Sequence, residues 1–231
     1  MNNLIVIKNL VKQYNSHKKI KILNKINFSF KKGKIYSLVG PSGSGKSTLL
    51  NLLSLIDRPS SGHIKIANKN INFSDASIND ELRANKIGII YQDNNLLPDF
   101  NALENVYLAR LAIDNNKNKA IEDSKKIIKN LKLYKRLEHF PFELSGGEIQ
   151  RIAIARALIN SPEIILADEP TGSLDYKNAK EVFKILFKLK KKFFGDDFRE
   201  QKNYRFNSSK LWWAKTFLWF EDVWEIENYI V

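Results

Sequence analysis

The chain has 231 residues, of which 43% are hydrophobic and 11% aromatic, and it contains no cysteine. This length predicts one large domain or two small ones with a sizeable core. The composition excludes collagen-like, disulfide-stapled and wholly disordered proteins. No stretch approaches the ~20 apolar residues of a membrane span, and residues 1–10 lack the pattern of a signal peptide. We therefore expect a soluble, globular, cytosolic protein.

The chain carries 38 Lys and Arg against 25 Asp and Glu, a formal net charge of +13. Such a charge indicates a nucleic acid, a membrane surface or an acidic partner, although a merely lysine-rich composition explains it equally well. Residues 194–231 hold five basic and seven acidic residues, whereas the rest of the chain holds 33 and 18. All four Trp also lie in the last twenty residues. The tail therefore differs in composition from the body.

The first third of the chain predicts strands around one helix. Alternating apolar residues predict two antiparallel strands over 4–11 and 22–30, and the nearly continuous apolar run 35–39 predicts a buried strand. From Lys46 onward the sequence is apolar nearly all round, which predicts a helix packed inside an α/β layer. A further hairpin is expected over 62–73.

The middle of the chain alternates between predicted strands and helices. Short apolar strands are expected over 87–91 and 163–167, and apolar and charged residues recur at helical spacing over 101–133. Further helices are expected over 148–158 and 177–190. This alternation predicts an α/β fold with a parallel sheet, preceded by an antiparallel β subdomain and interrupted by a helical insert.

A phosphate-binding loop follows the strand at 35–39. Gly-Pro-Ser-Gly-Ser-Gly-Lys-Ser fits the P-loop pattern G-x-x-x-x-G-K-[ST], between a predicted strand and a predicted helix. The glycines let the backbone approach phosphate oxygens, the lysine neutralises β/γ-phosphate charge, and the Ser47 hydroxyl is offered to Mg²⁺. A chance glycine turn rarely has this context. The expected nucleotide-binding residues are Gly40, Pro41, Ser42, Gly43, Ser44, Gly45, Lys46, Ser47 and Thr48.

Two acidic residues end the predicted strand at 163–167. Asp168 lies at the carboxyl end of this strand, where an open α/β sheet binds its ligand, so it is a candidate Mg²⁺ ligand. Glu169 is then placed to polarise an attacking water as a general base. The alternative is an ordinary strand end with solvated carboxylates.

The sequence Leu-Ser-Gly-Gly-Glu at 144–148 combines a capping box with two glycines. It could simply begin a helix. It could equally be a second anion site, because its glycines expose the N–H groups of the first helical turn. No strand precedes it, so the phosphate would be presented from elsewhere.

These motifs, together with Tyr91-Gln92 and Leu-Ala-Asp-Glu-Pro-Thr-Gly-Ser-Leu-Asp at 166–175, occur in one order and spacing. Over about residues 5–189 the chain resembles the ATP-binding subunits of ABC transporters, P-loop NTPases in which two copies sandwich two ATP molecules head to tail. The resemblance implies ATP and Mg²⁺ as cofactors. It implies that the signature closes on ATP held by the opposite copy through Ser145, Gly146 and Gly147.

The same resemblance assigns roles to single residues. Tyr14 corresponds to the aromatic residue that stacks on adenine. Gln92 corresponds to the glutamine that contacts Mg²⁺ and couples hydrolysis to the membrane partner. Asp168 and Glu169 correspond to the Mg²⁺-binding and water-activating acids, and Asp175 to the acid that communicates across the dimer interface. The implied catalytic residues are thus Glu169 and Gln92, and the implied metal ligands are Ser47, Gln92 and Asp168.

The run from Ile90 to Val106, with Leu-Leu-Pro-Asp-Phe at its centre, is similar to the LolD subfamily of lipoprotein-releasing ATPases. Members are peripheral proteins on the cytoplasmic face of the bacterial inner membrane. They pair with two integral membrane subunits and energise the release of outer-membrane lipoproteins to a periplasmic carrier. The alternatives are MacB-type exporters, FtsE-type division ATPases and non-transport ABC ATPases. One P-loop and one signature speak against the last class, so we expect no nucleic acid.

The chain departs from this family after the Asp175 loop. Members have a further strand ending in Thr-His-Asp, whereas the three His of this chain, His17, His63 and His139, all precede Asp168. We therefore expect an ABC domain over 1–194, with a helical subdomain over about 93–155, and a divergent tail over 195–231 that lacks one core strand. The tail is a frameshift product, a degenerate terminus or an aromatic docking segment. In each case we expect ATP binding with impaired turnover.

Overall fold

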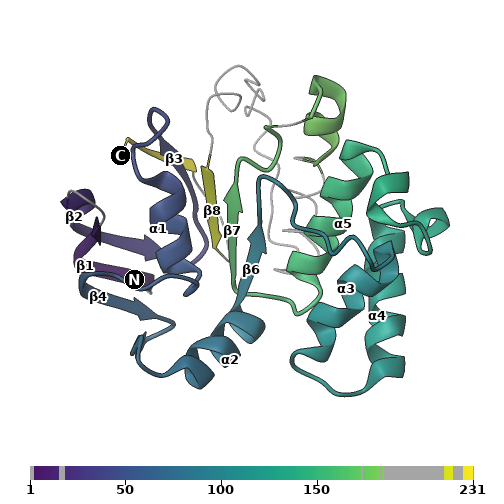
Figure 1. Ribbon diagram of the computed structural model, residues 1–231, viewed down its shortest axis with the longest axis horizontal. Coiled ribbons are helices and arrows are strands. Elements are labelled where there is room, and N and C mark those ends of the chain that lie inside the picture. Colours follow the sequence, from purple (N-terminus) through teal and green to yellow (C-terminus); the bar gives the residue numbers. More distant parts are fainter. Residues whose placement is uncertain are drawn as a thin grey trace. The chain divides into compact units, whose positions relative to one another are not determined.

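The structure is a computed structural model, and it describes residues 3–15, 19–172, 174–182, 184, 216–220 and 226–230 (Figure 1). The chain divides into two compact units. The first comprises Met1–Arg83, Leu166–Asp168 and Phe206–Val231, and the second Ala84–Ile165 and Glu169–Arg205. The predicted helical subdomain over about 93–155 lies within the second unit. Among the described residues no helix is long and apolar enough to span a membrane.

An antiparallel sheet forms one layer of the first unit, with the strand order β2-β1-β4-β5. The strands β1 (Asn3–Asn15) and β2 (Lys19–Lys31) pair along their whole length, and β4 (Ser61–Ile66) and β5 (Lys69–Asn70) extend the sheet. Both long strands outrun the predicted ranges. Their inward positions are apolar and buried, which fixes the register: Ile5, Ile7, Leu10, Leu23 and Phe30.

The strand β3 (Ile35–Val39) leads into the P-loop and α1 (Lys46–Leu53). Tyr36 of β3 is fully buried and meets Phe28 and Phe30 edge to face, with ring centroids 5.7 and 5.0 Å away. The Tyr36 hydroxyl also accepts a hydrogen bond from the Lys31 N–H at 2.9 Å. This aromatic cluster anchors the strand that carries the P-loop.

The tail contributes strands to the first unit, which corrects the expectation that a core strand is lost. The strand β8 (Thr216–Phe220) pairs antiparallel with β3 on one side, and β9 (Ile226–Ile230) pairs parallel with β3 on the other. Both segments are rich in aromatic and β-branched residues, which favour strands whatever their origin. The other tail residues lie outside the described residues, and so do residues 183 and 185–190 of the helix predicted over 177–190.

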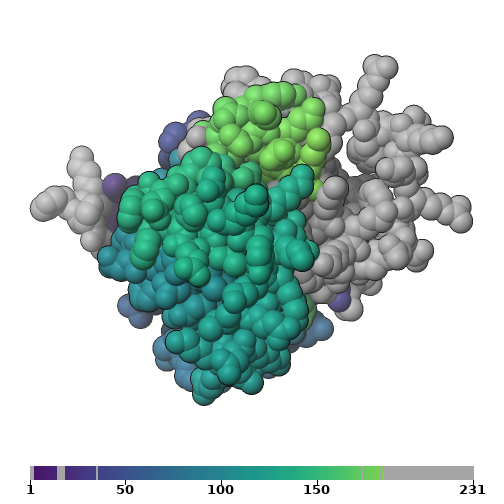
Figure 2. Space-filling view, turned by 90° about the vertical axis from the view of Figure 1, so that its right-hand side faces the viewer, coloured from purple at the N-terminus to yellow at the C-terminus, as the bar shows by residue number. Residues whose placement is uncertain are grey.

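The second unit contains the helices α3 (Ala102–Leu111), α4 (Lys117–Asn130) and α5 (Gly146–Leu158), which pack against one another. Figure 2 shows a face of this unit formed by the teal and green segments. The strand β6 (Ile87–Ile90) and the start of β7 (Ile164–Asp168) also belong to it. The remaining elements are α2 (Ala76–Lys86), which begins in the first unit, and the short helices η1 (Tyr134–Arg136) and η2 (Pro141–Glu143).

Candidate functional site

The loop between β3 and α1 has the backbone that a P-loop requires. Gly43 and Gly45 have φ angles of 82° and 94°, a region that side chains rarely adopt. The Ser44 N–H donates to the Pro41 carbonyl at 3.3 Å, which closes the turn. Gly45 is the N-cap of α1 and, within the described chain, no side chain caps it and no acidic residue lies in the first turn. The N–H groups and positive potential of this helix terminus therefore face the loop.

Lys46 is placed at the mouth of this loop. Its side chain is buried at 7% exposure, and its ammonium donates to the carbonyls of Gly40 and Pro41 at 3.0 and 2.7 Å. It also lies 3.4 Å from the Ser44 hydroxyl. A buried ammonium held by three loop oxygens is a fixed positive charge beside the N–H groups at the start of α1.

The β1–β2 hairpin lies against the same loop. A Cβ atom on Gly45 would come within 3.0 Å of side-chain carbons of both Ile22 and Leu23. Leu23 is paired across the hairpin with Lys12, and Tyr14 is two residues further along β1. Sheet register therefore places the predicted adenine-stacking residue on β1, the strand paired with the one that contacts the P-loop.

Tyr14 is 44% exposed, and its hydroxyl donates to Asp57 at 3.1 Å. The Lys12 ammonium lies 4.7 Å from the centre of the Tyr14 ring and donates to Asp57 at 2.7 Å. Burial tends to raise the pKa of Asp57, but the hydrogen bonds from Lys12, Arg58 and Tyr14 lower it below its usual value. The ionised Asp57 thus fixes an aromatic ring with an exposed part available for stacking.

The two predicted acids fall in different units. Asp168 is the last residue of β7 and belongs to the first unit, which also contains the P-loop. Glu169 begins the next segment of the second unit. Glu169 has a φ of 42°, a left-handed conformation that is uncommon for residues other than glycine and that occurs at functional sites. Its carbonyl accepts from the Gly172 N–H at 2.9 Å, and a Cβ on Gly172 would lie 3.0 Å from Glu169 Oε2. Gly172 therefore makes room for the carboxylate.

The signature begins α5 with the predicted capping box. Ser145 is the N-cap, its backbone N–H and hydroxyl both lie 2.9 Å from Glu148 Oε2, and Gly146 beside it is exposed. Glu148 Oε1 accepts from Arg136 Nε at 2.8 Å. Burial tends to raise the pKa of Glu148, but the hydrogen bonds from Ser145 and Arg136 outweigh it and lower the pKa to about 2.

Asp175 lies next to the signature within the second unit. Its carboxylate accepts from the backbone N–H and the side-chain amide of Asn178 at 2.9 and 2.6 Å, so it caps the helical stretch 176–182. The N–H of Asn178 is the main cause that lowers the pKa of Asp175. A Cβ on Gly147 would meet Asn178 Oδ1 at 2.8 Å. The Asp175 loop is therefore in close contact with the signature of its own chain.

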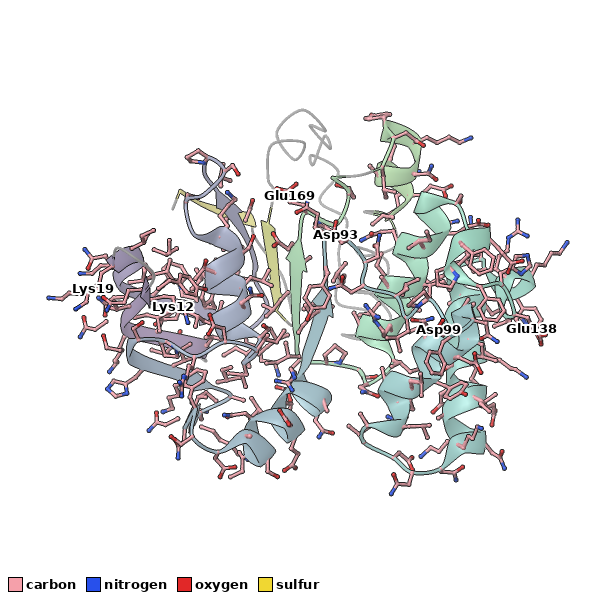
Figure 3. All side chains as sticks on the ribbon, in the orientation of Figure 1. Lys12, Lys19, Asp93, Asp99, Glu138 and Glu169 are labelled. Atoms are coloured by element: carbon pink, nitrogen blue, oxygen red, sulfur yellow. The ribbon has the colours of Figure 1, made fainter. Side chains whose placement is uncertain are left out.

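Gln92 is exposed and follows β6, and the turn after it is held by α5. Asn94 and Asn95 both have left-handed backbones, with φ angles of 58° and 46°. Their two carbonyls accept from the guanidinium of Arg156 at 2.6 Å each. Figure 3 shows Asp93 of this turn after β6 and Glu169 after β7. The far end of the signature helix thus fixes the loop that carries Gln92.

Comparison with known proteins decides the family. The family model described as "ABC transporter" matches residues 23–172, from the hairpin beside the P-loop to the turn after Glu169. The chain belongs to the ABC transporter family. Its fold is accordingly that of the ABC ATPase cassette, which confirms the predicted P-loop NTPase class.

Several relatives of this ABC cassette carry the same name. Proteins named "Lipoprotein-releasing system ATP-binding protein LolD" from Rickettsia bellii and Buchnera aphidicola subsp. Schizaphis graminum are 46% and 44% identical to it over 191 and 192 residues. Each match covers 82% of this chain and 84% of the relative. The corresponding protein of Treponema denticola is 43% identical, with coverage of 81% and 83%.

Solved structures agree with the fold. The ATP-binding cassette MJ0796, described as a dimer in a post-hydrolysis state bound to ADP and Pi, matches with a TM-score of 0.75 and 38% identity. The match covers 81% of this chain and 83% of MJ0796. A second structure of MJ0796, a "bacterial ABC transporter cassette", is also dimeric and matches with a TM-score of 0.74 and 39% identity.

Within this cassette the sequence-predicted residues form two groups. The P-loop, Tyr14 and Asp168 belong to the first unit. The second unit holds Gln92, Glu169, the signature and Asp175. Four residues that support these groups were not predicted from the sequence. They are Arg136, Arg156, Gly172 and Asn178. The charge of Arg136, opposite to that of Glu148, was a signal in the sequence. The other three contact backbone or fill space in ways that no local pattern shows.

Proposed function

We propose that this ABC ATPase is the ATP-hydrolysing subunit of a transporter that releases lipoproteins from the inner membrane for transfer to a periplasmic carrier. The observation that carries the ATPase part is the P-loop, with two left-handed glycines, an uncapped helix terminus and the buried Lys46 ammonium. The lipoprotein part is supported by relatives 43–46% identical that are named for a lipoprotein-releasing system.

ATP would bind with its phosphates on the P-loop and its adenine against Tyr14. The donor set fits Mg²⁺, which prefers oxygen ligands and is commonly held by one or two carboxylates together with substrate phosphates. The Ser47 hydroxyl and the Asp168 carboxylate are such donors in the first unit, and Gln92 would add a third. Among the described residues no cluster of three or more His, Cys, Asp or Glu could hold a metal alone, so the phosphates would complete the shell. Glu169 would accept the proton of the attacking water.

Two copies would share two ATP molecules head to tail. The signature supports this arrangement, because Ser145 and Gly146 are exposed at a helix N-terminus in a unit that has no P-loop of its own. The dimeric description of MJ0796 supports it as well. Two integral membrane subunits and a peripheral position on the cytoplasmic face of the inner membrane complete the proposal. The rival transport assignments are MacB-type and FtsE-type complexes.

The test is ATP binding and hydrolysis by the full chain, alone and with candidate membrane subunits. We expect ATP binding that Lys46→Ala abolishes, and hydrolysis stimulated by lipoprotein-releasing membrane subunits but not by exporter or division subunits. Because the chain has no Thr-His-Asp segment after Asp168, turnover should be below that of a variant carrying one. Equal turnover would contradict that expectation, and absence of ATP binding would refute the proposal itself.

A further inference from the structure

A network of four side chains leads from the signature to the surface of the second unit. The Ser145 hydroxyl contacts Glu148 Oε2 at 2.9 Å, and Glu148 Oε1 accepts from Arg136 Nε at 2.8 Å. On its other side, Arg136 Nη1 lies 3.2 Å from His139 Nε2. A guanidinium only donates, so the ring nitrogen is the acceptor in this contact. The guanidinium is therefore held from both sides.

The position of Glu148 creates an electrostatic problem for an anion site. A carboxylate at the third residue of a helix caps the N-terminus well. The same negative charge lies beside the N–H groups that would receive a phosphate, and it repels that phosphate. The Glu148 side chain is 16% exposed, so solvent screens it only in part, and Arg136 is the cation paired with it.

We propose that Arg136 is a positioning residue of the ATP-binding signature. The positive charge of Arg136 offsets the negative charge of Glu148. Its hydrogen bond to Glu148 Oε1 keeps Glu148 Oε2 directed at Ser145. The N-cap geometry of Ser145 is then fixed, while the net charge beside the glycine N–H groups stays near zero. This inference rests on the proposed function, in which Ser145, Gly146 and Gly147 bind the γ-phosphate of ATP held by a second copy.

A double-mutant cycle separates this role from a structural one. The full chain with Glu169→Gln, which slows hydrolysis, serves as the parent, and the readout is the ATP concentration that gives half-maximal dimerisation by light scattering. Arg136→Gln should raise this concentration about tenfold, because an uncompensated charge at a helix N-terminus acts on an anion at this scale. ATP affinity of the monomer should not change, since the P-loop lies in the other unit.

In the Glu148→Gln background there is no charge to offset. Arg136→Gln should then raise the ATP concentration for half-maximal dimerisation less than about twofold. Lys135→Gln removes the same charge from the exposed neighbouring residue and should leave dimerisation unchanged. The inference is overturned if Arg136→Gln raises the ATP concentration for half-maximal dimerisation equally in both backgrounds. It is also overturned if Lys135→Gln raises that concentration as much as Arg136→Gln does. If the parent binds ATP but does not dimerise, the head-to-tail part of the proposed function is wrong and this inference fails with it. If the parent dimerises and Arg136→Gln has no effect, the inference alone is wrong.

Discussion

Three glycines of the first unit have similar backbones and very different surroundings. Gly43, Gly45 and Gly62 have φ angles of 82°, 94° and 91°. In the described part of the chain no heavy atom lies within 4 Å of a Cβ built on Gly43. A Cβ on Gly45 would meet side-chain atoms of Ile22 and Leu23 at 3.0 Å. A Cβ on Gly62 would meet the Asn9 carbonyl oxygen at 2.3 Å. Alanine substitutions at these positions therefore separate backbone strain from steric overlap.

Each substitution should destabilise the chain by a different amount. The left-handed backbone costs an alanine about 1–2 kcal/mol at every position, and the lower entropy of the unfolded alanine chain offsets about 0.4–1 kcal/mol of that. Gly43→Ala should therefore cost about 1 kcal/mol. Gly45→Ala should cost about 1–3 kcal/mol more, because flexible side chains must shift. Gly62→Ala should cost the most, because the overlap is with backbone.

Urea denaturation followed by circular dichroism measures these differences as shifts in midpoint at constant m-value. ATP affinity provides an independent readout, since Gly43 and Gly45 are in the P-loop and Gly62 is not. Gly43→Ala should weaken ATP binding with little loss of stability, and Gly62→Ala should do the reverse. Equal stability losses for all three variants would refute the argument, because strain alone would then explain them.

Three further predictions concern the second unit. Gly172→Ala should lower kcat about 10–100-fold with unchanged ATP affinity, because its Cβ would displace the Glu169 carboxylate; Glu169→Gln should abolish turnover and keep binding. Arg156→Ala should reduce stimulation by the membrane subunits more than basal activity, because the turn after Gln92 loses two hydrogen bonds; equal reductions would contradict this. The pKa of Glu148 is lowered from 4.5 to about 2, so its contribution to stability is present above about pH 4.5 and is lost as the pH falls towards 2. Acid unfolding of Glu148→Gln should lack this component, and identical acid transitions would contradict the assignment.

Most of the fold could be predicted from the sequence, because periodicity and turn residues report burial directly. The hairpin strands, the P-loop, α5 and β7 all occur within a few residues of their expected positions. The helix α2 was missed, since its mean hydropathy is low and only Asn79 and Leu82 are buried. The tail strands were missed for another reason. Strand pairing uses backbone groups, so β8 and β9 can flank β3 without any motif in their sequence.

The candidate site could be predicted less completely, because a motif identifies the residues that contact ATP but not those that hold them. The capping-box role of Glu148 could be predicted from the sequence. Its partner Arg136 could not, because it lies twelve residues upstream in a short helix. Asn178 lies against Gly147 of the signature while its amide donates to Asp175. Such contacts depend on tertiary packing rather than on local spacing.

The helix α5 connects three functional segments of the second unit. Its N-terminus bears the signature and touches Asn178 of the Asp175 loop, while Arg156 near its C-terminus holds the turn after Gln92. Thirteen helical residues span about 20 Å. A displacement of the signature on closing around ATP would move Arg156 as part of the same rigid helix. The turn after Gln92, which we propose as the contact with the membrane partner, would therefore move with the signature without any change inside the helix.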